Sequence, residues 1–447
     1  EYQKLRNLVT TKISESKTKY FFDLDKDYPK NPKKKWEEIR KVFPLRKSKQ
    51  AVFPDMDINV LNKHFANLGE IATSELPEKT GMPKMKGIPS IYTFELNPVS
   101  YTDVLRHLKA LPNKSSNDVL NMDSYLLKRS AHVIANFITY FINLSIMKQD
   151  LPDDFKLSRV TPIYKGSGPT NDKSSYRPIS VTCHVSKVLE HFINKQLISY
   201  LSKHSFISND QSAYLKHHST VTSLHNVVDD FLQNFDDGLF TAVCFLDIAK
   251  CFPSIDHEIL LHKLDWYGVR GNENIWFKNY LSNRSQVVRV NGISSETSPV
   301  KLGVPQGSVL GPTLFLIYVN DLVQHTSNCS CSMFADDAMA YNVGTTPDEA
   351  ISKLQEGLAT MEVWYHDNRL CTNATKSKWM LMYSSRKSPT HSITPNLSGQ
   401  PLQNVTCYKQ LGILLDSNLN WSEHIKSIVK KVTGKLYILK QLVKCMP

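Results

Sequence analysis

The stretch Phe334-Ala335-Asp336-Asp337-Ala338-Met339-Ala340-Tyr341 places two adjacent carboxylates between two apolar arms. This pattern predicts two short strands joined by a tight turn, with Asp336 and Asp337 at its tip. Adjacent acids repel each other, so such a pair is favoured where water or a cation neutralises it. Carboxylate oxygens suit a hard ion such as Mg²⁺, which keeps coordination positions for substrate phosphates. Taken alone, an Asp-Asp pair is most often an ordinary solvated hairpin turn.

A second acidic segment strengthens the interpretation of Asp336 and Asp337 as a metal site. The segment Thr241-Ala242-Val243-Cys244-Phe245-Leu246-Asp247-Ile248 has the pattern of a buried strand that ends on the carboxylate of Asp247. Strand-borne acids that meet in space can hold the paired ions of a phosphoryl-transfer site. Between the two acidic segments lies Gly303-Val304-Pro305-Gln306-Gly307-Ser308-Val309-Leu310-Gly311-Pro312, which is rich in turn residues and precedes an expected helix over Thr313–Leu322.

These three segments, in this order, resemble the palm motifs of reverse transcriptases, and their variants are most similar to those of non-LTR (LINE-type) retrotransposons. The resemblance implies an RNA-directed DNA polymerase, a nucleotidyltransferase that extends a DNA 3′-hydroxyl on an RNA template with dNTPs. Its fold would be α+β, a right-hand polymerase with an antiparallel palm sheet, fingers and a partial helical thumb. Asp247, Asp336 and Asp337 would be catalytic and would bind two Mg²⁺ ions, with Mn²⁺ as a possible substitute.

Two cations near the first strands are candidates for the nucleotide site. Val160–Lys165, a loop over 166–175 and Tyr176–Ser180 resemble the fingers of this family. The resemblance places Lys165 and Arg177 over the incoming triphosphate. Phosphate recognition is well served by a point charge together with a planar guanidinium. Exposed cations in loops are common, so these residues alone would indicate only a solvated surface.

Three further residues take their roles from the resemblance. Phe252 follows Asp247 where family members place an aromatic ring beneath the sugar, although relatives often carry a small residue and an acid at Cys251 and Pro253. Gln306 would border the template base and the incoming nucleotide, and Lys376 would lie near the leaving pyrophosphate. The alternatives are an ordinary core phenylalanine and an exposed lysine. Asp256 is expected to cap a helix through Leu264.

The 447 residues are long enough for more than one domain, and the net charge of +12 with a pI near 9.1 suits a polyanionic partner. We divide the chain into a basic N-terminal extension and linker (1–100), a helical lead-in (101–150), reverse transcriptase fingers and palm (151–416) and the start of a thumb (417–447). The excess positive charge of residues 1–50 indicates either nucleic-acid contact or a solvated helical face. Residues 75–100, rich in Pro, Gly and Lys, are typical of a linker.

No apolar run reaches the roughly 18 residues of a membrane span, and the scattered cysteines are typical of reduced thiols in an intracellular protein. We therefore expect no membrane partner and a location in the nucleus or cytoplasm. The first residue, Glu1, suggests a fragment of a longer polypeptide, and whether an endonuclease precedes it stays open. Two rival functions also stay open: a catalytically silent nucleic-acid-binding remnant, and an RNA-dependent RNA polymerase.

Overall fold

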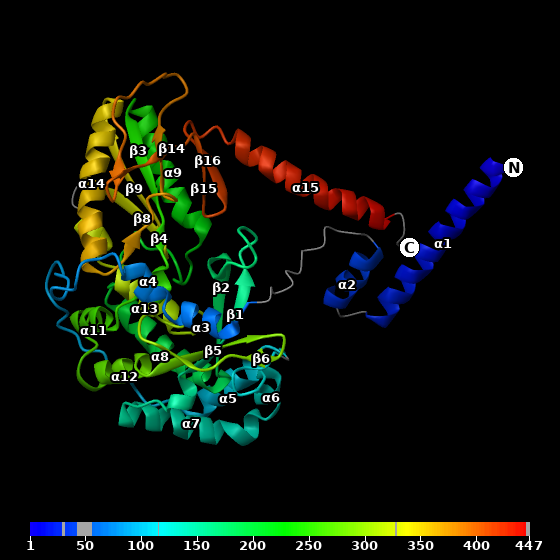
Figure 1. Cartoon of the computed structure of the whole chain (residues 1–447), viewed down its shortest axis with the longest axis horizontal. Coiled ribbons are helices and arrows are strands. Elements are labelled where there is room, and N and C mark those ends of the chain that lie inside the picture. The colour runs from blue at the N-terminus through cyan, green and yellow to red at the C-terminus, as the bar shows by residue number, and fades with distance from the viewer. Residues whose placement is uncertain (29–31, 43–55, 115, 327–328, 444–447) are drawn as a thin grey trace. The chain divides into compact units, whose positions relative to one another are not determined.

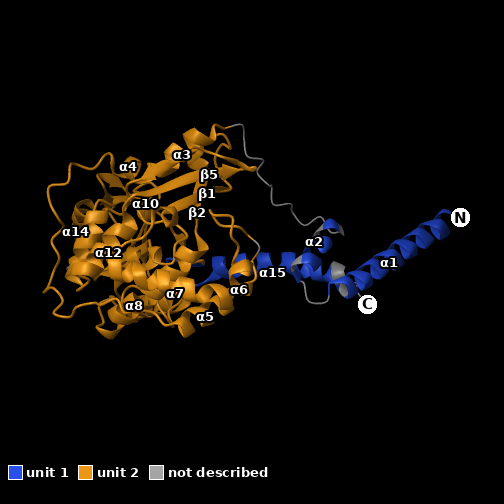
Figure 2. Ribbon diagram, turned by 90° about the horizontal axis from the view of Figure 1, so that it is seen from below, with its two compact units in different colours: residues 1–52, 413–447 blue, residues 53–412 orange. Residues whose placement is uncertain are grey.

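The computed structural model of the protein describes residues 1–28, 32–42, 56–114, 116–326 and 329–443. The chain forms two compact units, one from residues 1–52 and 413–447 and the other from residues 53–412 (Figure 2). Among the described residues, no helix is both long and apolar enough to cross a bilayer. The domain boundaries expected at residues 100, 150 and 416 stay predictions.

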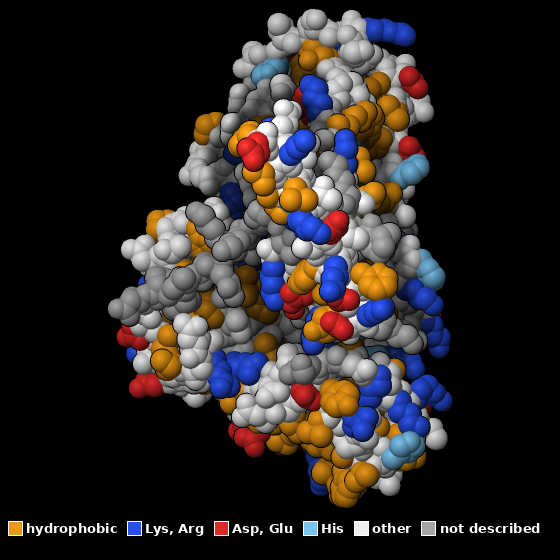
Figure 3. All heavy atoms as spheres, turned by 90° about the vertical axis from the view of Figure 1, so that its right-hand side faces the viewer, with side chains coloured by type: hydrophobic (Ala, Val, Ile, Leu, Met, Phe, Trp, Pro, Cys, Tyr) orange, Lys and Arg blue, Asp and Glu red, His pale blue; other side chains and the backbone are white. Residues whose placement is uncertain are grey.

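The smaller unit is mainly helical. Its elements are α1 (Tyr2–Asp27), α2 (Pro32–Val42), β16 (Ile413–Asp416) and α15 (Ser422–Val443). A small apolar cluster forms where Phe21, Leu24 and Ile39 are buried and Ile438 packs against them. Much of the remaining apolar surface of α1 and α15 is exposed. The face of the whole chain drawn in Figure 3 carries Lys and Arg side chains interspersed with hydrophobic and acidic ones.

The larger unit is built around a five-stranded central sheet (Figure 1). Its order is β14 (Gln403–Asn404), β11 (Lys378–Met382), β3 (Phe240–Leu246), β9 (Asp337–Gly344) and β8 (Ser330–Phe334). Every residue of β3 is buried, because α9 (Thr220–Asp236) and α14 (Pro347–Asp367) both pack against this strand. A strand that is apolar apart from Thr241 is therefore what the position requires.

A second sheet has the order β2 (Tyr176–Thr182), β1 (Leu157–Tyr164), β5 (Arg284–Val290) and β6 (Ile293–Ser294), with β7 (Ser298–Val300) also paired to β5. The turn between β5 and β6 has positive φ at both Asn291 and Gly292, as expected for an Asn-Gly hairpin. Helix α3 (Ile58–Ala66) packs on this sheet. Its Asn62 amide donates to the Gln286 carbonyl and the Ser298 hydroxyl in a buried contact.

The remaining elements surround the two sheets. The helices are α4 (Leu68–Thr73), α5 (Tyr101–Ala110), α6 (Ser124–Arg129), α7 (Ala131–Lys148), α8 (His184–Lys203), α10 (Cys251–Ser254), α11 (His257–Trp266), α12 (Gly271–Leu281) and α13 (Gly311–Val319). The 3₁₀ turns are η1 (Asp153–Phe155), η2 (Lys173–Ser175) and η3 (Leu322–His325), and the short strands are β4 (Ile248–Ala249), β10 (Cys371–Thr372), β12 (Asn396–Leu397), β13 (Gln400–Pro401) and β15 (Cys407–Gln410). Asp256 caps α11 by accepting from two backbone N–H groups, which confirms its predicted role.

The chain thus combines helices with mixed sheets, in agreement with the α+β prediction. The prediction of an antiparallel sheet is confirmed for the ladders that join β11, β3, β9 and β8. It is wrong at the edge of that sheet, where β14 pairs with β11 in parallel. Sequence pattern defines which residues are extended, but the direction of an edge strand depends on the path of the preceding loop.

Residues 74–100 contain no helix or strand, yet specific contacts hold them to the larger unit. Lys79 forms an ion pair with Asp256 at 3.3 Å. Backbone hydrogen bonds join Ser90 N–H to the Trp266 carbonyl and Phe94 N–H to the Gly268 carbonyl, both at 2.9 Å. The Pro-rich composition therefore corresponds to an irregular strap along α11, and these contacts limit its freedom to move.

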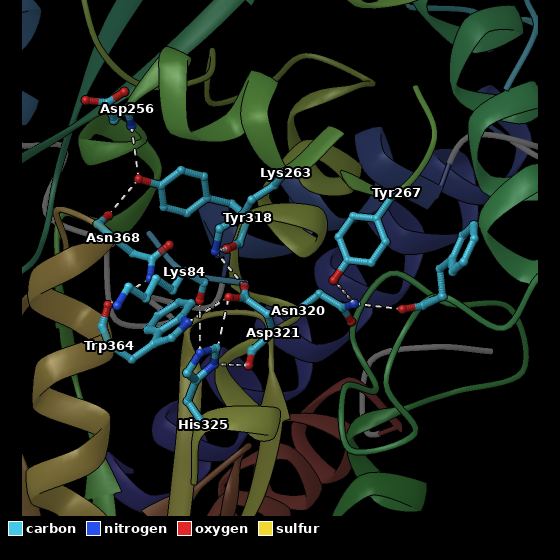
Figure 4. Close-up of polar contacts among 11 residues, drawn as sticks. Lys84, Asp256, Lys263, Tyr267, Tyr318, Asn320, Asp321, His325, Trp364 and Asn368 are labelled. Atoms are coloured by element: carbon cyan, nitrogen blue, oxygen red, sulfur yellow. Dashed lines mark hydrogen bonds and ion pairs between the residues drawn. The ribbon is translucent and has the colours of Figure 1, made fainter. Parts of the chain in front are cut away.

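A buried ion pair lies between α11 and η3 (Figure 4). The Lys263 and Asp321 side chains are both 0% exposed, and Lys263 Nζ lies 2.5 Å from Asp321 Oδ1. Trp364 Nε1 donates to Asp321 Oδ2 at 2.9 Å, and the Lys263 ammonium lies over the Trp364 ring. Lys263 also donates to the Tyr318 carbonyl at 2.6 Å. The network therefore ties α11 and α13 to α14, which packs against β3 and β9 of the central sheet.

Removing only the cation of this buried ion pair should destabilise the fold. We expect Lys263→Met to lower the free energy of unfolding by about 3–5 kcal/mol, because it leaves the Asp321 carboxylate buried without its cation. Urea denaturation would measure the loss. The double variant Lys263→Met/Asp321→Leu should recover much of it, whereas Arg106→Met, which breaks an exposed pair with Asp103, should cost less than about 1 kcal/mol. A loss under about 1 kcal/mol for Lys263→Met would show that the pair contributes little.

Candidate catalytic site

The two acidic segments meet at one end of the central sheet. Asp337 is the first residue of β9 and pairs with Phe334 of β8, so Asp336 lies in the turn between these strands. Leu246 of β3 pairs with Ala338 of β9 in the antiparallel ladder. Asp247, directly after β3, therefore lies beside Asp337. The predicted hairpin and the predicted strand-end acid are both confirmed as structural features.

A loop between β10 and β11 holds the backbone of Asp247 from both sides. Asp247 N–H donates to the Ser377 hydroxyl at 3.0 Å, and Asn373 N–H donates to the Asp247 carbonyl at 2.8 Å. The same loop carries Lys376, whose Nζ lies 3.5 Å from Asp247 Oδ2. The Asp247 side chain keeps 39% of its surface exposed. Lys376 thus lies next to Asp247, and its predicted place near the leaving pyrophosphate stays a prediction.

The three carboxylates are close enough for the charges of Asp336 and Asp247 to affect the pKa of Asp337. Burial raises the pKa of Asp337, and the charges of Asp336 and Asp247 raise it further. In the described parts of the chain, no set of three or more ligating side chains is already arranged to hold a metal ion. The donor chemistry nevertheless fits a hard divalent cation, because carboxylate oxygens are its preferred ligands and a cation would relieve the repulsion.

Basic side chains approach the same region from the second sheet. Lys165 follows β1, and its Nζ donates to the Ser174 carbonyl at 2.6 Å, whereas Arg177 lies on β2 opposite Ile163. Both are exposed. Lys250, three residues after Asp247, is exposed as well. Desolvation by the surrounding protein lowers its pKa, and the charges of Lys165, Lys376 and Arg177 lower it further.

Cations from the β1–β2 hairpin and from the β10–β11 loop are therefore close enough to Lys250 for their charges to lower its pKa. The sequence motifs predict Lys165, Arg177 and Lys376 separately, whereas they do not single out Lys250. The sequence signal for Lys250 is its position just after the strand-end acid Asp247. In the structure the chain bends at Lys250 (φ +50°) and enters α10. A set of like charges held close together is favoured when an anionic ligand neutralises them.

Helix α10 carries Phe252 near the acids. Cys251, the preceding residue, is buried beside Asp336, and the charge of that carboxylate adds to burial in raising the pKa of the thiol. The Phe252 ring stacks on Phe315 of α13, with ring centroids 4.6 Å apart and an interplanar angle of 12°. The ring is only partly buried. Phe252 is therefore both a core neighbour and a residue with a free surface, so packing alone does not decide its role.

The loop that carries Gln306 is fixed from two directions. Ser180 N–H, on β2, donates to the Gln306 carbonyl at 3.0 Å. Glu190 of α8 is fully buried, and its Oε2 accepts from Val309 N–H at 2.6 Å and from Leu310 N–H at 3.2 Å. Glu190 was not singled out from the sequence, because it lies within an apolar helical stripe. Its carboxylate anchors the start of α13 and so the loop before it.

This arrangement suits the binding of an anionic, metal-complexed substrate. Acids at the end of the central sheet could share a cation with phosphate oxygens. The cations around Lys250 could neutralise the remaining phosphate charge. Both groups lie on segments held by backbone hydrogen bonds, so they are positioned before a substrate binds.

Comparison with known proteins agrees with this chemistry. Residues 163–415 match the protein family described as reverse transcriptase (RNA-dependent DNA polymerase). The probable RNA-directed DNA polymerase from transposon BS of Drosophila melanogaster is 27% identical over 368 residues, 79% of this chain and 40% of that protein. Those from the X-element and the mobile element jockey of the same species are 28% and 26% identical, over 67% and 79% of this chain and 33% and 39% of those proteins. The chain therefore spans 40% or less of the length of these relatives.

Proposed function

The chain belongs to the reverse transcriptase family, and on that basis we propose that it is the RNA-directed DNA polymerase of a non-LTR (LINE-type) retrotransposon. It extends the 3′-hydroxyl of a DNA primer or target with dNTPs on an RNA template. The observation that carries this proposal is the meeting of Asp247, Asp336 and Asp337 at one end of the central sheet. In this assignment the central sheet is the palm, the β1–β2 hairpin belongs to the fingers, and α15 begins a thumb.

The three carboxylates are the residues that would hold divalent metal ions, Mg²⁺ or Mn²⁺. When bound there, two such ions would favour deprotonation of the primer hydroxyl and stabilise the charge of the departing pyrophosphate. Asp247 and Asp336 are the principal ligands in this assignment, and Asp337, at the start of β9, contributes less directly. The hydrogen bonds that the Asp247 backbone makes with the Ser377 hydroxyl and the Asn373 N–H keep Asp247 at the end of β3 while the substrates exchange.

The cations bind the polyphosphate. Lys165 and Arg177 contact it from the β1–β2 hairpin, while Lys376 lies on the side of the leaving pyrophosphate. Lys250 adds a fourth positive charge between them. Phe252 lies beneath the sugar of the incoming nucleotide, and Gln306 borders the template base. These roles follow the family motifs and are supported by the convergence of charge around Lys250.

Primer extension separates this proposal from its rivals. The protein should extend a DNA primer annealed to an RNA template when it is supplied with dNTPs and Mg²⁺, and extend it poorly with rNTPs. Preferential use of rNTPs would favour an RNA-dependent RNA polymerase. Tight binding of the primer–template without extension by either nucleotide would favour a silent nucleic-acid-binding remnant.

The phosphate role of Arg177 can be tested with a conservative change. Arg177→Lys keeps the charge but removes the planar pair of donors, so we expect the KM for dNTP to rise about tenfold, corresponding to about 1.4 kcal/mol. Steady-state incorporation at varied dNTP concentration measures this. Arg289→Lys, at an exposed position of the same sheet, is the matched control and should leave the KM unchanged. An effect limited to template affinity would instead place Arg177 on the path of the RNA.

A further inference from the structure

The turn that carries the acids contains a strained residue. Ala335 lies between β8 and β9 with φ +58°, in the left-handed region that residues other than glycine rarely occupy. Such a conformation is strained and persists only where its surroundings hold it. Ala335 is also only 7% exposed, so its N–H group needs a partner within the protein. Whatever provides that partner also sets the direction in which Asp336 leaves the strand.

That partner is the side chain of Gln211, which is 0% exposed. Its Oε1 accepts from Ala335 N–H at 3.1 Å and from Ala213 N–H at 3.0 Å. Two backbone donors converge on this atom, so the oxygen of the amide, and not its nitrogen, must face the turn. Gln211 Nε2 has no hydrogen-bond partner among the described residues. Among the described residues, the buried amide therefore makes only these two hydrogen bonds, and it accepts in both.

The backbone around Gln211 is attached to the same strand. Ser212 N–H donates to the Met333 carbonyl at 3.0 Å, and Met333 N–H donates to the Asp210 carbonyl at 2.8 Å. These bonds place residues 210–213 alongside the last residues of β8. The charge of Asp336 also contributes to raising the pKa of Tyr214, so this carboxylate lies close to the segment. The amide of Gln211 is thus supported by its own backbone at the point where the chain turns.

We infer that Gln211 is a positioning residue that holds Ala335 in its left-handed conformation and thereby aims the Asp336 carboxylate. Gln211 touches no reacting atom and acts only through the backbone of the turn. The inference rests on the proposed polymerase function for its kinetic consequences. It also predicts a change in metal binding that can be measured without any substrate.

Two substitutions at this position distinguish positioning from simple packing. Gln211→Met has a similar shape but removes the acceptor, so the Ala335 N–H group loses its partner and the turn can relax. Gln211→Glu, which burial would keep protonated, retains an acceptor oxygen in the same place. Gln233→Met, on the exposed face of α9, is the matched control. Circular dichroism should confirm that all variants are folded.

For the Met variant we expect kcat to fall about 10²-fold, as small displacements of catalytic groups can cause, with the KM for dNTP changed less than about threefold. Mn²⁺ binding to the full chain without nucleotide, followed by electron paramagnetic resonance, should weaken in the Met variant. The Glu variant should restore both properties, and the Gln233 control should match wild type.

Unchanged kcat and Mn²⁺ affinity in the Met variant would overturn the inference. So would a variant that loses thermal stability and activity together while it binds Mn²⁺ normally, since that result indicates packing only. A wild-type chain that does not extend primers would refute the proposed function instead. The Mn²⁺ measurement would still decide the role of Gln211 in that case.

Discussion

Asp247→Asn and Asp336→Asn should each reduce primer extension at least about 10³-fold, which corresponds to about 4 kcal/mol of transition-state stabilisation. Each change replaces a carboxylate by a neutral amide of the same shape, so the site keeps its form but loses a charged oxygen ligand. The affinity for metal ions depends on that charge. Single-turnover extension at saturating dNTP and Mg²⁺ measures the loss. Fluorescence anisotropy should show that primer–template binding remains within about twofold of wild type.

Asp236→Asn, an exposed change at the end of α9, serves as the control and should leave extension unaffected. Asp337→Asn should also be severe, although less so than the other two, because Asp337 takes the less direct role in the proposed metal site. Near-normal turnover by either principal variant would show that the metal assignment is wrong. Loss of primer–template binding in parallel with activity would instead point to a folding defect.

The local structure of the acidic turn was predictable because short-range chemistry defines it. Apolar arms on each side of Asp336 and Asp337 require extended chain, and two adjacent acids require a solvated tip. The same holds for Asp256 at the start of α11 and for Asn291-Gly292 between β5 and β6. In each case the residues that determine the structure lie within a few positions of one another.

The hydrogen bonds that hold the site in place were not predictable, because they join residues that are distant in sequence. Nothing near Gln211 indicates that its amide would reach Ala335, and Ser377 gives no local sign of its bond to Asp247. Glu190 occupies one position of an apolar stripe, where periodicity favours a core residue and does not reveal which backbone groups it will meet. These contacts depend on how the two sheets and their helices pack. A pattern read along one chain contains little information on that packing.

Discrimination between sugars should depend on Phe252. Phe252→Val is expected to raise kcat/KM for rNTP relative to dNTP by one to several powers of ten, each worth about 1.4 kcal/mol. An apolar pocket alone cannot strongly reject an added hydroxyl, so rejection of the 2′-hydroxyl has to come from steric conflict with a side chain held in place. The stacking of Phe252 on Phe315 would prevent the ring from moving aside. The backbone of Phe252 is also closely packed, because a Cβ at Gly303 would lie 2.7 Å from the Phe252 carbonyl oxygen.

Steady-state incorporation of matched rNTP and dNTP by wild type and variant measures the ratio directly. The competing explanation is that Phe252 is an ordinary core residue, since its ring packs on α13. In that case Phe252→Val would lower stability and reduce incorporation of both sugars equally. Phe231→Val reproduces this outcome as a control, because Phe231 is fully buried in α9 and its loss should destabilise the fold without changing the ratio. A changed ratio in the Phe252 variant alone would show that Phe252 rejects the 2′-hydroxyl, and an unchanged ratio would exclude this role.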